Sequence, residues 1–581
     1  MTNKDVAAKL REVFVMMQLA GENRFKAIAF DRAAQTIEGL KTEVQKHIEE
    51  DSLTDIKGIG KSIAEDIRAL AETGTMPVLE DLKERVPKGL VEWLSISGLG
   101  PKGIVKIHKA LDITEVAELK EACQSGAVAD LPGMGKKSAE KIIKSIEYLE
   151  KFGERCRIDQ AVDIAEPMLT FVEQMDGVLK CEIAGSLRRS AETIGDVDIL
   201  AAAHAEDASD IFEQFVNHDL VVEVLGRGDT KSSVRTENGR QVDLRIVSEQ
   251  EYPAALMYFT GSKEHNIVMR QRARERGMAL NEYGLFKLSD EKETDFDQPV
   301  ETSSEAGIYK KLDLNFVPPE HREDRGEFEF YEEKEEMNLV ELDQVKGVVH
   351  AHSTYSDGKY SIRQMADACI KRGYEYLTMT DHSKTAAYAG GLTIDRVKQQ
   401  WDEIDELNEE YSKKNFRIFK GIESDILNDG SLDYPDEILE GFDIVIASVH
   451  SGLEMEYKKM MTRFENAIKN PYTHMIGHPT GRLLLKRGES KLDLNKLIEL
   501  AAEHNTAIEI NANPRRLDLD WRYGNKAKET GLLTSINPDA HSTDGIDDIR
   551  FGVMIARKAK FSPDRVLNTK SADEFSEWLL K

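Results

Sequence analysis

The stretch GVVHAHSTYSDG (347–358) joins a short apolar run to two histidines, His350 and His352, and an aspartate, Asp357. The apolar residues predict a buried strand, and the polar residues follow at its C-terminal end. Because side chains alternate along a strand, two histidines separated by one residue point to the same side. Imidazole and carboxylate groups together are typical ligands of Zn²⁺, Mn²⁺ or Fe²⁺. The stretch therefore predicts a metal site at a strand end.

Six further apolar runs follow the same plan and alternate with helix-like stretches. They read YLTMTDH, FRIFKGIE, DIVIASVH, HMIGHP, AIEIN and LLTSINPDAH. This alternation predicts a parallel sheet of seven strands, closed into a barrel whose site lies at the C-terminal ends. The candidate ligands at these ends are His350, His352, Asp357, His382, Glu423, His450, His478, Asp539 and His541. Nine ligands are more than one tetrahedral ion needs, so they predict a cluster of two or three metal ions. We interpret His474 and His504 as structural histidines.

A different acidic site is predicted upstream, in GSLRRSAETIGDVDIL (185–200). Asp196 and Asp198 alternate with apolar residues, so on a strand both carboxylates face the same side. Their mutual repulsion would be compensated by divalent cations, which also clamp the oxygens of a phosphoryl transfer. Asp243 in RQVDLRIV (240–247) supplies a third carboxylate. Gly185-Ser186 and the following arginines offer amides, a hydroxyl and guanidinium groups suited to a triphosphate.

The N-terminal part contains a threefold repeat: IKGIGKSIAEDI (56–67), ISGLGPKGIVKI (96–107) and LPGMGKKSAEKI (131–142). Two glycines around an apolar residue permit a tight turn with free backbone N–H groups at the start of the next helix. Such a turn binds a phosphate, although each copy alone could be an ordinary glycine-capped helix junction. The residues expected to contact DNA are Gly58, Gly60, Lys61, Gly98, Gly100, Gly133, Gly135 and Lys136.

Length and composition limit the possible classes of protein. With 581 residues the chain exceeds one hydrophobic core and predicts about three or four domains. The net charge of −28 argues against indiscriminate nucleic-acid binding but allows a segregated basic face. The four scattered cysteines predict free thiols in a reducing cytoplasm. No apolar run approaches the ~18 residues of a membrane helix, so we expect no membrane partner. We also expect a cytoplasmic monomer.

The ordered set Gly-Ser-x-Arg-Arg, Gly-Asp-x-Asp and strand Asp, followed by YFTGSKEHNIVMR (258–270) and NEYGLF (281–286), resembles X-family DNA polymerases, the group that contains DNA polymerase beta. The resemblance implies that Asp196, Asp198 and Asp243 are catalytic and bind Mg²⁺ or Mn²⁺. It implies nucleotide contacts from Gly185, Ser186, Arg189, Gly195, Tyr258, Phe259, Gly261, Asn266 and Arg270. The repeated turns resemble the helix-hairpin-helix module, which holds the DNA backbone without reading its sequence.

The C-terminal half resembles the PHP (polymerase and histidinol phosphatase) domain, whose motifs are all present. The fold expected is therefore multidomain: α-helical helix-hairpin-helix domains, an α+β nucleotidyltransferase palm and thumb, and a distorted TIM-like (β/α)7 PHP barrel. The expected boundaries are 1–85 for the N-terminal helical domain, 86–155 for a fingers-like DNA-binding subdomain, 156–255 for the palm, 256–318 for the nucleotide-selecting subdomain, 319–345 for an acidic linker and 346–575 for the PHP domain. We interpret the acidic run EDRGEFEFYEEKEEMNLVELDQ (323–344) as a solvated linker.

These resemblances imply a bifunctional DNA repair enzyme. Its partners would be gapped or primer-template DNA and dNTPs, and its PHP half would hold two or three Zn²⁺, Mn²⁺ or Fe²⁺ ions and act as a 3′-5′ exonuclease, with abasic-site cleavage a further option. A sugar-phosphate lyase is doubtful, because Asp66 stands at the expected lysine. Two alternatives stay open: a PHP phosphoesterase with an inert polymerase half, and a DNA-binding scaffold with a structural metal site. Arg482 and Arg516 are weaker candidates for phosphate contact.

Overall fold

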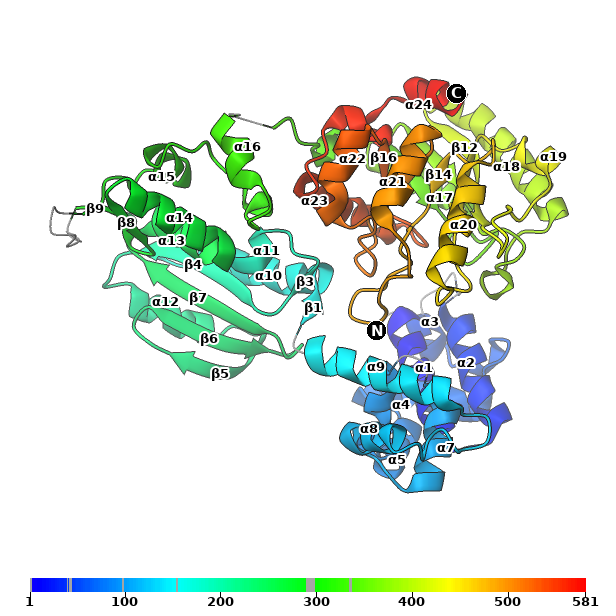
Figure 1. Cartoon of the computed structure of the whole chain (residues 1–581). Helices are drawn as coiled ribbons and strands as arrows, with labels where there is room; N and C mark the ends of the chain where they lie inside the picture. The colour runs from blue at the N-terminus through cyan, green and yellow to red at the C-terminus, as the bar shows by residue number, and fades with distance from the viewer. Residues whose placement is uncertain are drawn as a thin grey trace. The chain divides into compact units, whose positions relative to one another are not determined.

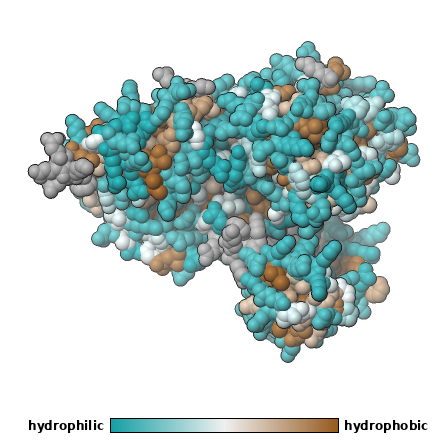
Figure 2. Space-filling view, viewed as in Figure 1, coloured by the Kyte–Doolittle hydropathy of each residue, from teal (hydrophilic) through white to brown (hydrophobic). Residues whose placement is uncertain are grey.

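The computed structural model describes residues 3–38, 40, 44–96, 99–152, 155–288, 298–333 and 337–580. The chain divides into two compact units, Met1–Glu154 with Leu485–Arg487, and Arg155–Leu484 with Gly488–Lys581 (Figure 1). Among the described helices none is both long and apolar enough to cross a membrane. Figure 2 shows hydrophilic residues over most of the visible surface, with hydrophobic ones in small scattered groups, as is ordinary for a folded surface.

The first unit is helical in its described residues. Its helices are α1 (Asn3–Leu19), α2 (Arg24–Glu38), α3 (Val44–Glu49), α4 (Lys61–Thr73), α5 (Pro77–Arg85), α6 (Lys88–Glu92), α7 (Pro101–Leu111), α8 (Val116–Gln124) and α9 (Lys136–Phe152). One apolar core runs through the unit, from Leu10 in α1 through Ile67 and Trp93 to Ile142 in α9. The amphipathic helices therefore cover a common interior, and their polar faces remain available to solvent or a ligand.

The second unit begins with a mixed sheet of five strands in the order β2-β4-β7-β6-β5. Their bounds are β2 (Val178–Ile183), β4 (Val197–Ala203), β5 (Val221–Arg227), β6 (Lys231–Thr236) and β7 (Gln241–Val247). The central pair β4 and β7 is parallel, and the other pairs are antiparallel. Helices α10 (Ile158–Glu173) and α12 (Ala208–Val216) pack their apolar sides against this palm sheet.

A smaller lobe follows the palm and has its own apolar core. It contains α13 (Tyr252–Thr260), α14 (Lys263–Glu275), the hairpin β8 (Met278–Asn281) and β9 (Gly284–Lys287), α15 (Glu305–Lys311) and α16 (Glu327–Glu333). Met269, Leu285 and Tyr309 lie in this core. It is the lobe that the sequence assigns to nucleotide selection.

The interpretation of the acidic run as a solvated linker is wrong for its first half. Phe328 and Tyr331 of α16 are buried in the core of the small lobe. Glu327 is fully buried, where its carboxylate lies 2.9 Å from His265 Nδ1 and accepts two backbone N–H groups. The physical reason is visible in the sequence EFEFYEE, because apolar residues at helical spacing give this charged segment one side that packs.

The C-terminal domain is a parallel sheet of seven strands in chain order from β10 to β16. The strands are β10 (Gly347–Ala351), β11 (Tyr376–Met379), β12 (Arg417–Asp425), β13 (Ile444–Ser448), β14 (Met475–Ile476), β15 (Ala507–Asn511) and β16 (Thr534–Asn537). The intervening helices include α17 (Ile362–Lys371), α18 (Ile394–Tyr411), α20 (Tyr457–Ile468), α21 (Leu494–Glu503), α22 (Gly524–Thr530) and α23 (Ile549–Lys558). A bridge from Ala351 to Ala540 links the first strand to the segment after the last, so the sheet nearly closes. The fold class expected from the sequence is confirmed.

Candidate active sites

Three carboxylates gather at the centre of the palm sheet. Asp198 on β4 lies directly beside Asp243 on the parallel strand β7, and Asp196 precedes the first residue of β4. One oxygen of each lies within 4.8 Å of the others, which is close enough for them to share metal ions. The i, i+2 pattern read from the sequence thus places Asp196 and Asp198 together, and the sheet adds Asp243.

The palm carboxylates repel one another. Burial, together with the carboxylates of Asp196 and Asp243, raises the pKa of Asp198 to about 7. Lys231 on β6 offsets part of this charge, because its Nζ lies 2.5 Å from Asp243 Oδ2, and Gln241 donates to Oδ1. Lys231 was not anticipated, since only the pairing of β6 with β7 brings it here. The excess negative charge fits a site for divalent cations.

The turn before β4 approaches these carboxylates closely. Gly185 opens the short helix α11 (Gly185–Arg188) with φ +62°, and a Cβ at this position would lie 2.1 Å from Asp198 Oδ2. Only glycine therefore fits both the backbone conformation and the space. Arg189 lies at the end of α11, where it donates to the Thr260 carbonyl and to Glu323. Arg188 is instead bound to Glu305.

Most of the remaining predicted nucleotide contacts lie on or beside α13 and α14. The rings of Tyr258 and Phe259 are 5.2 Å apart, and Asn266 donates to the Tyr258 carbonyl. Gly261 lies next to the Arg189 guanidinium, and Arg270 donates to the Asn266 carbonyl. The two other predicted contacts, Ser186 and Gly195, lie on α11 and just before β4. Contacts thus connect Arg189 to the α13–α14 junction, while the role of this set in nucleotide binding stays a prediction.

The nine predicted ligands of the C-terminal domain converge on one cluster at the strand ends. Glu423 is central and 1% exposed, with oxygens 2.9 Å from His382 Nδ1, 3.1 Å from His450 Nε2 and 3.0 Å from His478 Nε2. Asp539 lies 3.2 Å from His352 Nε2. His350, on the same strand end as His352, reaches both Glu423 and Asp539.

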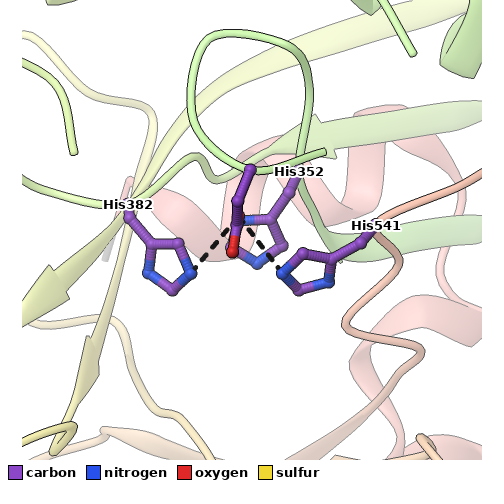
Figure 3. Close-up of side chains that lie close together, drawn as sticks. His352, His382 and His541 are labelled. Atoms are coloured by element: carbon purple, nitrogen blue, oxygen red, sulfur yellow. Dashed lines mark ion pairs between the residues drawn. The ribbon is translucent and has the colours of Figure 1, made fainter. Parts of the chain in front are cut away.

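The open edge of the cluster is formed by Asp357 and His541. His541 Nε2 is 3.3 Å from Asp357 Oδ1, and His382 Nε2 is 3.6 Å from the same oxygen. Figure 3 shows His352, His382 and His541 pointing toward one another around this carboxylate. His541 is 35% exposed, whereas His350 and His352 are fully buried. Ligands can therefore enter along the Asp357–His541 edge.

The buried atoms of this cluster fit bound metal ions. His350 Nε2, His352 Nε2 and Glu423 Oε2 are among the buried polar atoms that have no hydrogen-bond partner in the described part of the chain. Such atoms are costly unless a ligand engages them. His350 and Asp539 also have positive φ angles, of 68° and 50°, a strain that clusters at functional sites. Three overlapping groups within the cluster each have the spacing of a metal site.

Family comparisons match successive parts of the chain. A helix-hairpin-helix domain matches residues 1–76, a SAM-like helix-hairpin-helix tandem 91–147, the DNA polymerase beta thumb 255–323 and the PHP domain 349–513. The protein DNA polymerase/3'-5' exonuclease PolX of Bacillus subtilis (strain 168) is 42% identical over 587 residues, covering 100% of this chain and 99% of that relative. The chain belongs to the PolX family.

Two other relatives match shorter parts of this chain. A probable phosphatase of Thermoanaerobacter sp. (strain X514) is 30% identical over 236 residues, which are 38% of this chain and 89% of the phosphatase. DNA polymerase lambda of Rattus norvegicus is 24% identical over 341 residues, which are 55% of this chain and 56% of that polymerase. The resemblances to X-family polymerases and to the PHP domain are confirmed by these matches together with the family matches.

Two acidic residues that support the PHP cluster were missed in the sequence. Glu509 on β15 lies 2.7 Å from His350 Nδ1 and accepts the backbone N–H of His478. Asp425 at the end of β12 lies 3.1 Å from His450 Nδ1. Burial opposes a charged His450 imidazole, but Glu423 and Asp425 raise its pKa to about 10. In the sequence, Glu509 and Asp425 are visible only as acidic residues within the apolar stretches AIEIN and GIESD. The fold is needed to show which histidine each of them orients.

The two weaker arginine candidates differ in their surroundings. Arg482 is 5% exposed and is held by Asp520 at 2.7 Å and by Glu192 at 3.4 Å, so it is committed to a buried ion-pair network. Arg516 lies 3.6 Å from Asp539 and keeps some exposure. Only Arg516 is therefore free to approach a phosphate at the cluster.

Two of the three glycine turns lie fully in the described part of the chain. The carbonyl of Gly60 accepts from Ala64 N, that of Gly100 from Ile104 N and that of Gly135 from Ala139 N, so each glycine starts a helix. Lys61 and Lys136 are the first residues of α4 and α9, and Gly58 and Gly133 have positive φ. Gly98 lies outside the described residues. Asp66 on α4 is buried, and burial raises its pKa.

Proposed function

We propose that this protein fills short gaps in DNA by template-directed nucleotide addition and removes nucleotides from DNA 3′ ends with its PHP domain. The observation that carries the proposal is that the candidate residues of both sites come together: three carboxylates meet on or just before two adjacent palm strands, and nine candidate metal ligands gather at the barrel mouth. The matching PolX of Bacillus subtilis is named for both activities. Gapped or primer-template DNA and dNTPs are the partners, and the helix-hairpin-helix turns bind the DNA backbone.

The metal ions that we expect are Mg²⁺ or Mn²⁺ in the palm and two or three of Zn²⁺, Mn²⁺ or Fe²⁺ in the PHP domain. When bound, such ions neutralise charge on the transferred phosphoryl group and act as Lewis acids. The residues of the chain position these reactions. Lys231 and Gln241 fix the carboxylate of Asp243, Gly185 lets the turn of α11 approach Asp198 closely, and Glu509 orients His350. Arg189 would hold the triphosphate.

The location and assembly that we propose are a reducing cytoplasm and a monomer. All four cysteines are free thiols, and burial raises the pKa values of Cys123, Cys156 and Cys369. Since the thiolate is the reactive form, these side chains are inert core residues.

Reciprocal variants test the two-site proposal. An Asp196→Ala/Asp198→Ala variant should lose dNTP incorporation on a gapped duplex and keep degradation of a 3′-labelled strand, because the PHP ligands are untouched. His350→Ala should show the opposite pattern. If the wild-type protein extends no primer with Mg²⁺ or Mn²⁺, a PHP phosphoesterase with an inert polymerase half replaces the proposal. If the metal-loaded protein degrades no 3′ end, the cluster is structural.

A further inference from the structure

A cleft of about 560 Å³ opens beside the PHP cluster, in the second unit of the chain. Asp539 and His541 of the cluster form one wall of this cleft. Its other walls carry four cationic side chains, which are Arg157, Lys359, Arg515 and Arg516. The volume lies within the roughly 300–1,000 Å³ typical of pockets for small ligands. The cleft is therefore large enough for a nucleotide-sized group that touches the metal ligands.

Two of the cations in this cleft have no acidic partner. Lys359 and Arg515 are both exposed, and neither forms an ion pair within the part of the chain that the structure describes. Their position is unusual for a chain with a net charge of −28. Unpaired cations that line a concave surface raise the local concentration of anions. The ligand that suits the cleft is therefore negatively charged.

The acidic groups of the cleft weaken this field only in part. Asp159 is already paired with Arg157, at 2.8 Å. Burial and the neighbouring Asp159 raise the pKa of Asp548 to about 7, so this carboxyl carries only part of its charge at neutral pH. Asp539 faces the metal cluster and lies 3.6 Å from Arg516. The acidic groups that line the cleft therefore offset the charge of Lys359 and Arg515 only in part.

The backbones of the residues that carry these cations are anchored near the cluster. The backbone N–H of Lys359 donates to the His541 carbonyl at 2.8 Å, directly beside a predicted metal ligand. The Arg515 carbonyl accepts from Leu484 N, and its backbone N–H donates to Asn513. Arg157 ends the palm strand β1 (Cys156–Arg157), which pairs with β3 (Thr193–Ile194). A phosphate chain in this cleft would meet cations from both the palm and the PHP domain.

We propose that this cleft binds the backbone phosphates next to a DNA 3′ end, with Lys359 and Arg515 as the principal contacts and Arg157 as a contact from the palm. The inference rests on the proposed exonuclease function and specifies how its substrate is held. Apart from His541, no aromatic side chain lines the cleft in the described residues, so bases find no stacking surface there. Binding through phosphates alone is independent of sequence.

The test compares DNA with a small phosphodiester. The variants are Lys359→Ala/Arg515→Ala, Arg157→Gln and, as a matched control, Lys398→Ala, an exposed lysine of α18 outside the cleft. Hydrolysis of a 3′-labelled single-stranded oligonucleotide and of bis(p-nitrophenyl) phosphate is measured for each. We expect the double variant to raise KM for the oligonucleotide about tenfold, since two phosphate contacts are lost. Its kcat and its activity on the small diester should stay within about twofold of wild type.

A binding measurement separates this inference from the exonuclease proposal. Fluorescence anisotropy of a labelled single strand, in chelator and at several salt concentrations, gives the slope of log K against log salt. We expect the double variant to reduce that slope by about 1.4, at ~0.7 per phosphate contact, and the control to leave it unchanged. If the double variant changes neither the slope nor the KM, or loses activity equally on both substrates, the cleft does not bind DNA phosphates as proposed. If the wild-type protein degrades no DNA, that result counts against the proposed exonuclease activity. The salt slope would still show whether the cleft binds DNA phosphates.

Arg157→Gln tests the contribution of the palm separately. Because Asp159 neutralises part of its charge, we expect a smaller rise in the KM for the oligonucleotide, about twofold to threefold, with the small diester unaffected. If the KM of Arg157→Gln for the oligonucleotide equals that of Lys398→Ala, only residues of the PHP domain bind DNA in this cleft.

Discussion

The palm site and the PHP cluster both hold acidic side chains close together, yet they do so in different ways. In the palm, Asp196 is exposed, Asp198 is partly buried and Asp243 is buried, so the trio opens to solvent. In the PHP domain the central residues His350 and Glu423 are 0% and 1% exposed and are surrounded by further ligands. An open trio suits metal ions that arrive with a triphosphate, whereas a closed cluster suits ions that stay bound between turnovers.

The largest effect that we expect comes from breaking the closed cluster at its centre. Glu423→Ala removes the carboxylate shared by His382, His450 and His478. Nuclease activity should fall more than ~100-fold, because loss of groups that merely orient metal ligands already costs about 10–100-fold. Metal content, measured by elemental analysis after dialysis, should fall as well.

The control for this variant is Glu406→Ala, an exposed residue of α18 that should change neither readout. Primer extension by Glu423→Ala should stay within about twofold of wild type. Undiminished metal content together with full nuclease activity would show that Glu423 is not at the centre of the site.

In the palm, adding a single methyl group at Gly185 should disrupt the site. In Gly185→Ala the new Cβ would lie 2.1 Å from Asp198 Oδ2 and would be forced into a left-handed backbone conformation. A displacement of about 1 Å at a reacting centre can cost roughly 100-fold, so we expect a fall of this size in kcat/KM for dNTP incorporation. Gly226→Ala is the matched control, because a Cβ there meets open space. If Gly185→Ala polymerises normally, the turn does not define the nucleotide site.

The comparison also shows what the sequence could and could not predict. The gathering of the nine candidate PHP ligands was predictable because they lie at or near the ends of apolar runs, and a parallel barrel brings all strand ends to one mouth. Their role as metal ligands stays a prediction. That Asp196 and Asp198 lie together was predictable from their i, i+2 spacing, and Asp243 from its place in the strand-like stretch 240–247. Lys231 and Glu509 were missed because only strand register reveals their partners. The helical character of 327–333 was hidden by its charge, although Phe328 and Tyr331 have helical spacing.

One buried lysine of the PHP domain contacts the residues around Arg189. Lys558 on α23 is 1% exposed; its Nζ lies 2.6 Å from Glu323 Oε1 and donates to the Arg189 carbonyl at 2.7 Å. Since Glu323 also binds the Arg189 side chain, the PHP domain positions the arginine expected at the triphosphate. Lys558→Met should therefore raise the KM for dNTP about threefold to tenfold, or roughly 1 kcal/mol, with the nuclease within about twofold of wild type.

Lys371→Met, an exposed residue of α17, is the control for Lys558→Met. A general loss of stability in Lys558→Met would lower both activities together. If Lys558 instead positions Arg189, only the KM for dNTP should rise, and nuclease activity should stay the same. An unchanged KM for dNTP would mean that Lys558 does not position Arg189. Lys558→Arg keeps the positive charge and should therefore restore part of the wild-type KM.

The smallest effect that we expect concerns Asp548, a residue that lines the cleft beside the PHP cluster. Burial and Asp159 raise the pKa of Asp548 to about 7, above its unfolded value of about 4. The folded protein therefore binds more protons than the unfolded chain between these values, and stability falls as pH rises from about 4 to 7. Asp548→Asn removes this dependence and should stabilise the protein by ~1–2 kcal/mol at pH 8 but not at pH 4. Denaturant unfolding at both pH values measures the difference, and an equal effect at the two would show that Asp548 ionises freely in the folded protein.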